Sequence, residues 1–393
     1  MIRDYLRITD KPEEIRKTAK RLVEDVTINV DGVKKRFYTP LMLGKMKEEI
    51  LRHLPQATPE EIEELRLKFI YDYWMYGCTV DEEFYLHLIG KSDAEKREYM
   101  VRQIRNVYVK HLNRDAGDDR VRQLEDKYRL YQRLKPFYKR EVIEVREAAD
   151  FGTFACFAES HKEFVVKPVD CSLGVGVHKV TMDDFGGDCR AAFDSIISEG
   201  KAIHDKYPSK ATQMVLEELI VQDEALGKLH PFSINPVRAT AVRDKNGEIV
   251  LYRPRIKVGA NRSFIGSAAQ NSFLMEIDPL SGEIITDGFQ ENGNVAAVHP
   301  DTGIVFKGYQ IPRWPECAAF VKTLMAQLPG YGYIGWDLAL TPDGWCVIEG
   351  NYSGEFGSQM IRGRGLKKEF EELIGWKYDK DFWWQDNDRF AHN

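Results

Sequence analysis

The chain has 393 residues, which at ~150 residues per domain predicts two or three lobes rather than one small core. Its composition, 43% hydrophobic and 30% charged, is typical of a soluble globular protein, and its formal net charge of −6 argues against a nucleic-acid-binding surface. No apolar run approaches the ~18 residues of a membrane span, and the first residues lack the apolar core of a signal peptide. The six cysteines show no paired spacing, so we expect free thiols in a cytoplasmic protein. From the apolar runs and the net charge we expect no membrane span and no nucleic-acid partner.

Helices are predicted for most of the first third of the chain, and we assign residues 1–120 to a helical N-terminal region. Thr58 and Glu61 frame a capping box, and Gly77 is a suitable end for the helix that follows. A second capping box lies at residues 92–95. The apolar stripe over residues 101–112 predicts that its helix continues through that segment.

Beyond residue 140 the pattern changes to strands with interspersed helices, after a third long helix predicted over 119–140. Short apolar runs predict the strands, and residues 244–247 are typical of a hairpin turn. The predicted strands cover 142–145, 164–167, 214–219, 237–242 and 249–258, with two more inside 331–351, and further helices cover 188–204 and 315–328. This mixture predicts an α+β fold.

A hairpin over residues 331–351 carries a candidate metal site. Asp337 and Glu349 lie near each other in such a hairpin, and regular alternation along the return strand places Asn351 on the same face as Glu349. Two carboxylates and an amide oxygen suit Mg²⁺ that bridges nucleotide phosphates, with water and phosphate oxygens as further ligands. The alternative is a surface hairpin with ordinary acidic residues.

A candidate phosphate-binding segment begins at Lys167, the end of an apolar strand, and continues through small residues at Ser172, Gly174 and Gly176. The backbone amides of such a loop can approach phosphate oxygens closely. The loop is neither a Walker A sequence nor a dinucleotide fingerprint, and an ordinary strand with a glycine turn is the alternative. His178 lies directly beside this loop and is a weaker candidate for phosphate.

The strand predicted over 214–219 is apolar except for Glu217 and Glu218. Backbone groups of such a segment can hold an adenine, while a following polar side chain contacts the ribose. The alternative is a strand with an exposed acidic edge. Lys127 lies on a predicted helix, where a lysine is normally a solvated surface charge unless the fold brings it to the phosphates.

Basic residues load the hairpin that follows, and they include Arg238 and Arg243. Strand alternation predicts that Arg253, Arg255 and Lys257 share one face. Such a face near a Mg²⁺–phosphate site suits a transferred phosphoryl group or an anionic substrate. The alternative is a solvated hairpin face.

In their order and spacing these motifs resemble the ATP-grasp superfamily, in particular the sugar-transfer-associated ATP-grasp family. The resembling segments are 76–78, 126–128, 166–168, 217–222, 235–238, 335–337 and 349–351. The resemblance covers about 120 to 375 and extends loosely into the helical part. It departs at residues 264–271, where family members often carry Asp-Asn and Gly-Gly pairs, so the acceptor side matches less well than the nucleotide side.

The resemblance implies an ATP-grasp fold with ATP and Mg²⁺ as ligands. The domain would span 121–393, with two α+β lobes at about 121–225 and 226–375 that clasp the ATP. The implied nucleotide contacts are phosphate binding by Lys127 and Lys167, a phosphate-covering loop at Ser172, Gly174 and Gly176, adenine contacts from Glu217, Glu218, Leu219 and Ile220, and ribose contacts from Gln222 or Glu224. The implied Mg²⁺ ligands are Asp337, Glu349 and Asn351. Arg238, and then Arg255, would stabilise γ-phosphate or acyl-phosphate charge.

The resemblance also implies an ATP-dependent carboxylate–amine ligase. Such an enzyme forms an amide bond through an acyl phosphate and releases ADP and phosphate. Its substrates would be small-molecule or peptide carboxylates and amines, including sugar- or polysaccharide-linked ones. Two alternatives share the fold: a phosphotransferase that acts on a hydroxyl, and a non-catalytic nucleotide-binding module. The second is disfavoured by the intact set Lys167, Asp337, Glu349 and Asn351.

Overall fold

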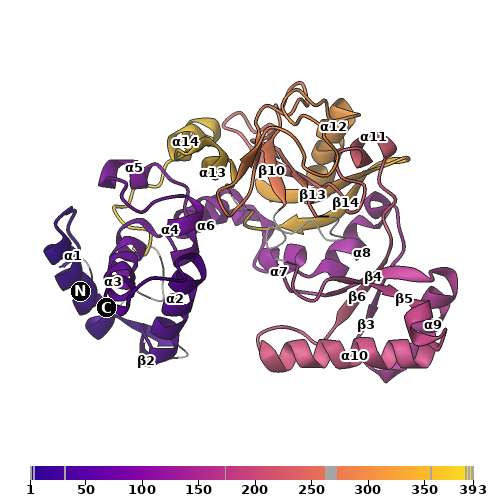
Figure 1. Ribbon diagram of the computed structural model, residues 1–393, viewed down its shortest axis with the longest axis horizontal. Coiled ribbons are helices and arrows are strands. Elements are labelled where there is room, and N and C mark those ends of the chain that lie inside the picture. The colour runs from indigo at the N-terminus through magenta and orange to yellow at the C-terminus, as the bar shows by residue number, and fades with distance from the viewer. Residues whose placement is uncertain are drawn as a thin grey trace. The chain divides into compact units, whose positions relative to one another are not determined.

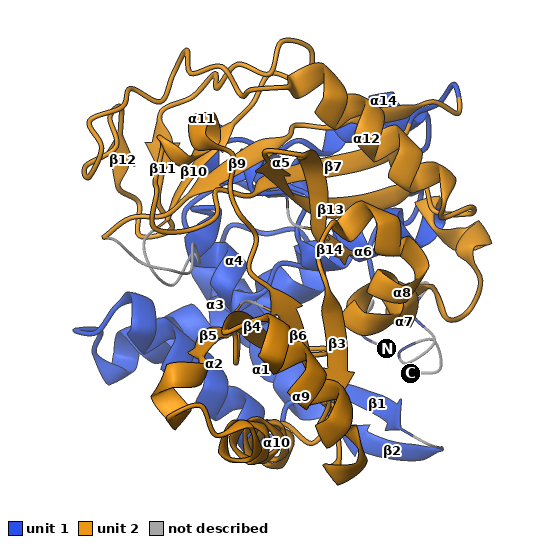
Figure 2. Ribbon diagram, turned by 90° about the vertical axis from the view of Figure 1, so that its right-hand side faces the viewer, with its two compact units in different colours: residues 1–111, 244–246, 355–393 blue, residues 112–243, 247–354 orange. Residues whose placement is uncertain are grey.

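The chain forms two compact units, which Figure 2 shows in different colours. The computed structural model describes residues 2, 5–30, 32–172, 174–261, 272–354, 356–385, 387 and 390. The first unit combines residues 1–111, 244–246 and 355–393, and the second combines 112–243 and 247–354. The C-terminal segment, which we assigned from sequence to the domain 121–393, therefore belongs to the same unit as the N-terminal helices.

The first unit is mainly helical. Its strands pair antiparallel in a two-stranded sheet. Its elements are α1 (Pro12–Asp25), β1 (Thr27–Val30), β2 (Val33–Arg36), α2 (Pro40–His53), α3 (Pro59–Tyr76), α4 (Val80–Tyr85), α5 (Asp93–Arg97), α6 (Arg102–Leu112), α13 (Ser358–Arg362) and α14 (Lys367–Ile374). The predicted start and end of α3 are confirmed, because Thr58 and Glu61 cap each other's backbone and Gly77 ends the helix with φ 85°.

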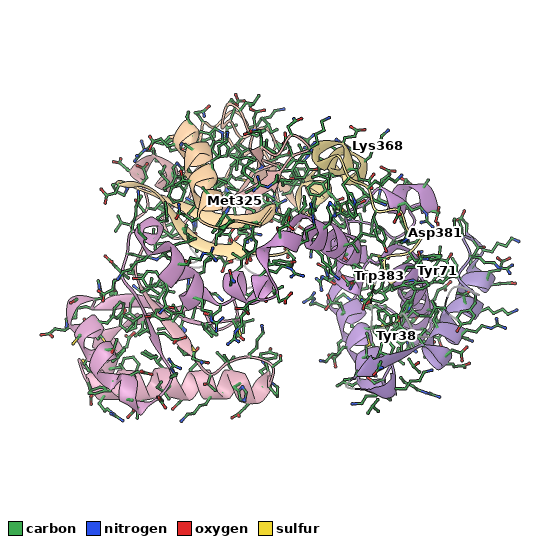
Figure 3. The ribbon with its side chains drawn as sticks, turned by 180° about the vertical axis from the view of Figure 1, so that it is seen from behind. Tyr38, Tyr71, Met325, Lys368, Asp381 and Trp383 are labelled. Atoms are coloured by element: carbon green, nitrogen blue, oxygen red, sulfur yellow. The ribbon has the colours of Figure 1, made fainter. Side chains whose placement is uncertain are left out.

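Aromatic side chains form the core of the first unit. Trp74 donates its indole N–H to the Tyr38 hydroxyl at 2.9 Å, and its ring lies against that of Trp383 with centroids 5.9 Å apart. Figure 3 labels Tyr38, Tyr71 and Trp383, which are all buried. The C-terminal segment thus supplies part of the core on which the early helices pack.

The second predicted helix of this unit is wrong in its length. α5 ends at Arg97, and α6 begins only at Arg102. Between them the backbone N–H of Met100 donates to the side-chain oxygen of Gln359 at 2.7 Å. A distant side chain therefore satisfies a backbone group that a continuous helix would have used.

The second unit contains two antiparallel sheets and the helices that cover them. The smaller sheet has the order β3-β6-β4-β5, and the larger has the order β12-β11-β10-β9-β7-β13-β14, with β8 also paired to β7. Its elements are α7 (Arg120–Glu125), α8 (Lys127–Tyr138), β3 (Val142–Val145), α9 (Phe151–Ser160), β4 (Glu163–Pro168), β5 (His178–Thr181), α10 (Cys189–Lys206), β6 (Met214–Glu218), α11 (Glu224–Gly227), β7 (Val237–Arg243), β8 (Ile249–Leu251), β9 (Arg255–Val258), β10 (Phe273–Glu276), β11 (Gly288–Phe289), β12 (Val295–Ala296), α12 (Trp314–Ala326), β13 (Tyr333–Thr341) and β14 (Gly344–Asn351).

Helices α9 and α10 cover one face of the smaller sheet (Figure 1). Phe164 and Val166 of β4 and Leu216 of β6 are buried in the core that these helices complete. Because alternate residues of a strand point to opposite faces, Lys167 and Glu217 project from the other face of this sheet. That face carries the nucleotide candidates.

The larger sheet packs its apolar face against α12 and α8. Trp336 and Leu338 of β13 are fully buried there, together with Val321 and Met325 of α12. Figure 3 labels Met325 on that helix. The α+β class predicted from the sequence is confirmed. In the described part of the chain no helix has both the length and the apolarity that crossing a membrane requires.

The third predicted helix is two helices in the structure. α7 ends at Glu125 and α8 begins at Lys127. The Asp126 carboxylate accepts the backbone N–H of Arg129 at 3.0 Å, and the backbone N–H of Lys127 donates to the carbonyl of Val169 at 3.0 Å. A new helix start therefore forms at Asp126, and it fixes Lys127 beside the end of β4.

Candidate functional site

One face of the larger sheet carries a line of charged side chains across five neighbouring strands. Glu349 in β14 lies opposite Asp337 in β13, and Asp337 lies opposite Arg238 in β7. Arg238 lies opposite Arg255 in β9, and Arg255 lies opposite Glu276 in β10. Because cross-strand partners share a face, these five side chains, which we call the charged row, project from the same side of the sheet.

A β-bulge brings Glu349 into the charged row. Regular alternation back from the turn would place Ile348 opposite Asp337. The register instead shifts after Leu338, which pairs with Val347, so that Asp337 pairs with Glu349. The prediction that Asp337 and Glu349 lie together is confirmed, but the predicted uninterrupted alternation along the return strand is wrong.

Asp337 and Glu349 have pKa values shifted in opposite directions. Burial, followed by the charge of Asp337, raises the pKa of Glu349. Burial is the largest single influence on Asp337 and would raise its pKa, but the charge and hydrogen bonds of Arg238, together with the charge of Lys257, lower the Asp337 pKa overall. Asn351 Nδ2 lies 3.4 Å from Asp337 Oδ2 and 3.4 Å from Glu349 Oε1. The negative charge of this pair therefore resides first on Asp337.

Arg238 binds Asp337 through two parallel hydrogen bonds. Its Nε donates to Oδ1 at 2.5 Å and its Nη2 to Oδ2 at 3.0 Å. The two side chains are only 22% and 16% exposed, so the ion pair is largely shielded from water. In the structure Arg238 therefore binds Asp337, the predicted metal ligand. The contact of Arg238 with phosphate stays a prediction.

The donor atoms of Asp337, Glu349 and Asn351 fit a hard cation such as Mg²⁺. A cation between the two carboxylates would relieve the repulsion that raises the pKa of Glu349, and rotation of the Asn351 amide would present its oxygen. Among the residues that the structure describes, no three His, Cys, Asp or Glu side chains gather at a metal-binding spacing. The protein would therefore supply these three ligands, and phosphate oxygens and water would complete the set.

The predicted basic strand is interrupted. Residues 249–258 form two strands, β8 and β9, because Arg253 between them adopts φ 43°. Arg255, which is buried, and Lys257 remain on one face of β9. The Arg253 guanidinium reaches this face from the bend and donates to Glu276 Oε1 at 2.6 Å. Arg253 and Lys257 therefore add two further cations beside Arg255 at the β9 end of the charged row.

A buried ion triad lies on the face of the smaller sheet that points away from α9 and α10. Lys167 Nζ lies 2.5 Å from Oε1 of Glu217, and Arg140 Nη2 lies 2.7 Å from Oε2 of the same carboxylate. Burial alone would raise the Glu217 pKa, but the charges of Arg140 and Lys167 lower it to about 2. Glu217 thus keeps its charge and holds Lys167 in place, in addition to the backbone role predicted for it.

Arg140 was missed by the sequence analysis. It follows α8 and belongs to no phosphate or nucleotide motif. The one sequence signal is Glu217 itself, because a carboxylate in an apolar strand needs a cationic partner. The sequence analysis considered Lys167 only as a phosphate ligand, and Arg140 is 77 residues from Glu217 and has no pattern that marks it.

Lys127 interacts electrostatically with both Lys167 of the ion triad and Glu349 of the charged row. Its Nζ donates to the carbonyl of Cys171 at 2.5 Å, and burial lowers its pKa. The charges of Glu349 and Lys167 also act on Lys127, and both lysines act in turn on Glu349. The predicted phosphate lysines and the predicted metal carboxylates therefore lie within electrostatic range of one another in the second unit.

The glycine loop is held by its own backbone. Ser172 and Gly174 are exposed, while Gly176 is partly buried with φ 69°. A Cβ atom at Gly176 would lie 2.8 Å from Pro168 Cγ and 2.9 Å from Ile203 Cδ1. Only glycine fits this position without displacing a neighbour, which keeps the loop close to the end of β4.

His178 follows the glycine loop in the sequence and contacts two neighbouring residues. His178 turns its Nδ1 to the carbonyl of Gly176 at 3.4 Å and its Nε2 to Glu199 at 3.5 Å. Its predicted phosphate contact stays a prediction. Leu173 of the loop and the divergent segment 264–271 lie outside the described residues.

The segment after β6 carries the residues predicted to contact the adenine and the ribose. Leu219 and Ile220 leave the strand half-buried, and the Glu218 carboxylate accepts the backbone N–H of Glu141 at 3.1 Å. The Gln222 amide donates to the carbonyl of Ser233 at 3.2 Å and accepts the N–H of Asn235 at 2.6 Å, whereas Glu224 is exposed at the start of α11. The adenine and ribose roles of these residues stay predictions.

Comparison with known proteins identifies the family of this chain. A family model described as sugar-transfer associated ATP-grasp matches residues 120–374. The solved D-alanyl-alanine synthetase A from Vibrio cholerae is 12% identical, with 65% of this chain and 62% of that chain covered and a TM-score of 0.38. N5-carboxyaminoimidazole synthetase from Staphylococcus aureus, complexed with ADP, is 13% identical, with 66% and 54% covered and a TM-score of 0.39.

Biotin carboxylase from Campylobacter jejuni is a third similar structure, 10% identical, with 66% of this chain and 48% of that chain covered and a TM-score of 0.41. This chain therefore spans less than two thirds of each of these solved chains, and no curated protein matches it. The family match covers well over half of the sequence and includes every predicted site residue. The chain belongs to the sugar-transfer-associated ATP-grasp family.

Proposed function

We propose that this protein is an ATP-dependent carboxylate–amine ligase that forms an amide bond and releases ADP and phosphate. The observation that supports this proposal best is that two buried lysines and the acidic pair Asp337–Glu349 lie within electrostatic range of one another. Lys127 and Lys167 lie by the smaller sheet, and they act electrostatically on Glu349, which lies opposite Asp337 on the larger sheet. Cations and carboxylates so placed suit a nucleotide triphosphate together with a divalent cation.

Each side of the site would contribute to nucleotide binding. Lys127 and Lys167 would neutralise phosphate oxygens, and the backbone amides around Gly174 and Gly176 would cover them. The half-buried backbone at Leu219 and Ile220 would contact the adenine. Catalysis by such a site consists of positioning and charge stabilisation, so no covalent nucleophile is needed.

Asp337, Glu349 and Asn351 would hold Mg²⁺, which when bound neutralises oxygens of the β- and γ-phosphates. A cation on Asp337 would compete with Arg238 for the charge of this carboxylate and favour release of the arginine, because Arg238 donates to both of its oxygens. The released guanidinium, together with Arg255, would then stabilise charge on the transferring phosphoryl group.

The proposed reaction has two balanced steps. A substrate carboxylate oxygen forms a bond to the γ-phosphorus as the bond between that phosphorus and the bridging oxygen breaks, which gives an acyl phosphate and ADP. An amine then attacks the acyl carbon and loses a proton, and phosphate leaves with the electron pair of the broken C–O bond. The basic group of Arg253, Arg255 and Lys257 would face the anionic substrate.

The family description associates its members with sugar transfer. We therefore propose substrates among uronic acids and other sugar-linked carboxylates or amines, beside amino acids and peptides. A screen of ADP release against pools of these compounds tests the proposal. We expect ADP and phosphate in equal amounts, and with the right carboxylate we expect hydroxylamine to give a hydroxamate without the natural amine.

Three outcomes of this screen would contradict the ligase proposal. AMP and pyrophosphate as products would exclude the acyl-phosphate route. A phosphorylated hydroxyl product without hydroxamate would favour the phosphotransferase. A wild-type protein that binds Mg²⁺–ATP but turns over with none of the pools would favour a nucleotide-binding module.

A further inference from the structure

Arg140 makes contacts with both sheets of the second unit. Its Nε and Nη2 donate to Oε2 of Glu217 at 3.0 and 2.7 Å, on β6 of the smaller sheet. Its Nη1 donates to the carbonyl of Val347 at 2.6 Å, on β14 of the larger sheet, and to that of Tyr138 at 3.0 Å. The side chain is 3% exposed, so its charge acts on its neighbours with little screening by water.

The charge balance of the triad depends on Arg140. Lys167 and Glu217 alone would form a neutral pair, since Lys167 Nζ lies 2.5 Å from Oε1. Arg140 adds a second cation on the other carboxylate oxygen, so the triad carries a net charge of +1. Lys167 and Glu217 are 7% and 6% exposed, so a nucleotide phosphate beside them would experience that net charge strongly.

We propose that Arg140 is a positioning residue that neutralises Glu217, so that the charge of Lys167 remains available to the nucleotide phosphates. This inference rests on the proposed function, because it concerns the same nucleotide site. The competing explanation is that Arg140 only fastens β14 to β6. The two explanations differ in how nucleotide affinity depends on the number of phosphates.

Arg140→Met separates them, because methionine fills much of the arginine volume without its charge. The measurement is calorimetric titration of the full-length protein with ATP, ADP, AMP and adenosine in Mg²⁺. We expect affinity to fall about 30-fold for ATP and less than about 3-fold for adenosine, with intermediate losses for ADP and AMP. An equal loss for all four ligands, or no loss for ATP, would overturn the inference.

Three further variants complete the test. Arg140→Lys keeps the charge and should leave the ATP-to-adenosine affinity ratio within about 3-fold of wild type. Arg140→Met combined with Glu217→Gln restores the net charge of Lys167 and leaves no buried carboxylate short of a cation, so it should fold and recover most of the ATP affinity even where the single variant does not fold. Failure of this double variant to recover ATP preference would contradict the inference. Arg133→Met, on the exposed surface of α8, controls for the loss of a positive charge in general.

The same titration distinguishes failure of this inference from failure of the proposed function. A wild-type protein that binds none of the four ligands would contradict the proposed function, and the role of Arg140 would fall with it. A wild-type protein that prefers ATP, with an Arg140→Met variant that keeps the same preference, would contradict the role of Arg140 alone.

Discussion

Asp337 and Glu349 lie opposite each other, yet their surroundings differ. Two hydrogen bonds join Asp337 to Arg238, whereas burial and the charge of Asp337 raise the pKa of Glu349. Replacing Glu349 with a neutral group therefore removes an unfavourable contact, while replacing Asp337 breaks an ion pair. The two carboxylates should then have similar effects on activity and different effects on stability.

We predict that Asp337→Asn and Glu349→Gln each lower turnover at least ~100-fold, as expected when a preorganised charge-stabilising group is lost. The melting temperature of Glu349→Gln should equal or exceed that of wild type, and that of Asp337→Asn should be lower. Steady-state ADP release and thermal unfolding measure the two effects. Near-normal turnover in both variants would remove these residues from the site.

Glu217 should contribute to stability above acidic pH. Its pKa is about 2 in the folded protein, below the ordinary value of 4.5. A lowered folded-state pKa gives a stabilisation that is complete above the unfolded-state pKa and is lost as pH falls through the folded-state pKa. For this fully buried group the shift corresponds to about 3 kcal/mol.

Urea unfolding of wild type and Glu217→Gln between pH 5 and pH 2 checks this prediction. The difference in unfolding free energy between the two proteins should shrink by about 3 kcal/mol over that interval. Glu224→Gln, at an exposed position in the same unit, is the matched control and should track wild type. A wild-type-to-Glu217→Gln difference that stays constant with pH would show that the triad does not hold the Glu217 charge.

At the scale of elements, the glycine loop depends on its contact with the end of β4 and with α10. Gly176→Ala should weaken nucleotide binding, because the added methyl would lie 2.8 Å from Pro168 Cγ and would move the loop. Gly186→Ala has a similar positive φ but meets nothing within 4 Å, so it controls for backbone strain of about 1 kcal/mol. Titration with a non-hydrolysable ATP analogue compares the two, and equal affinities would separate the loop from the nucleotide site.

Elements whose determinants lie within a few residues could be predicted from the sequence. The capping box of Thr58 and Glu61 and the stop at Gly77 define α3 by local hydrogen bonding and backbone conformation alone. Several strands beyond residue 140, among them β3, β6 and β7, also follow from local alternation and turns. The charges of Asp337 and Glu349 could likewise be paired, because they flank one short turn.

Features that depend on distant partners could not be predicted. The break between α7 and α8 is accompanied by a bond from the backbone of Lys127 to Val169, which is 42 residues away. The alignment of Arg238 with Arg255 and Asp337 depends on the strand order of the larger sheet, which no single motif encodes. Arg140 lacks any local signal, because its partner Glu217 meets it only in the folded chain.

At the scale of the whole molecule, each unit has its own buried charges. The cluster of the first unit joins Asp72, Cys78, Glu83 and Lys96, whose residues are at most 2% exposed. Lys96 pairs with Asp72 and lies 4.0 Å from Glu83 Oε2, and the Cys78 thiol donates to Glu83 Oε1 at 2.9 Å. Asp72 also binds Lys68 at 3.0 Å, whereas Glu83 has Lys96 only at the longer distance, so Glu83 is the less stabilised anion.

The first unit should consequently lose stability at alkaline pH. Burial, followed by the charge of Asp72, raises the pKa of Glu83 to about 8. A raised carboxyl pKa gives a stabilisation that is complete below the unfolded-state pKa near 4.5 and is lost as pH rises through the folded-state pKa. Between pH 7 and pH 9 this ionisation should lower the unfolding free energy by roughly 1 kcal/mol.

Glu83→Gln provides the comparison, because glutamine resembles the protonated side chain and does not ionise. Hydrogen exchange in α3 and α4, corrected for the intrinsic effect of pH, should show the loss in wild type and not in the variant. Exchange in β13 of the second unit should change equally in both proteins. A variant whose α3 and α4 lose as much protection as wild type between pH 7 and pH 9 would show that another group governs the alkaline stability of the first unit.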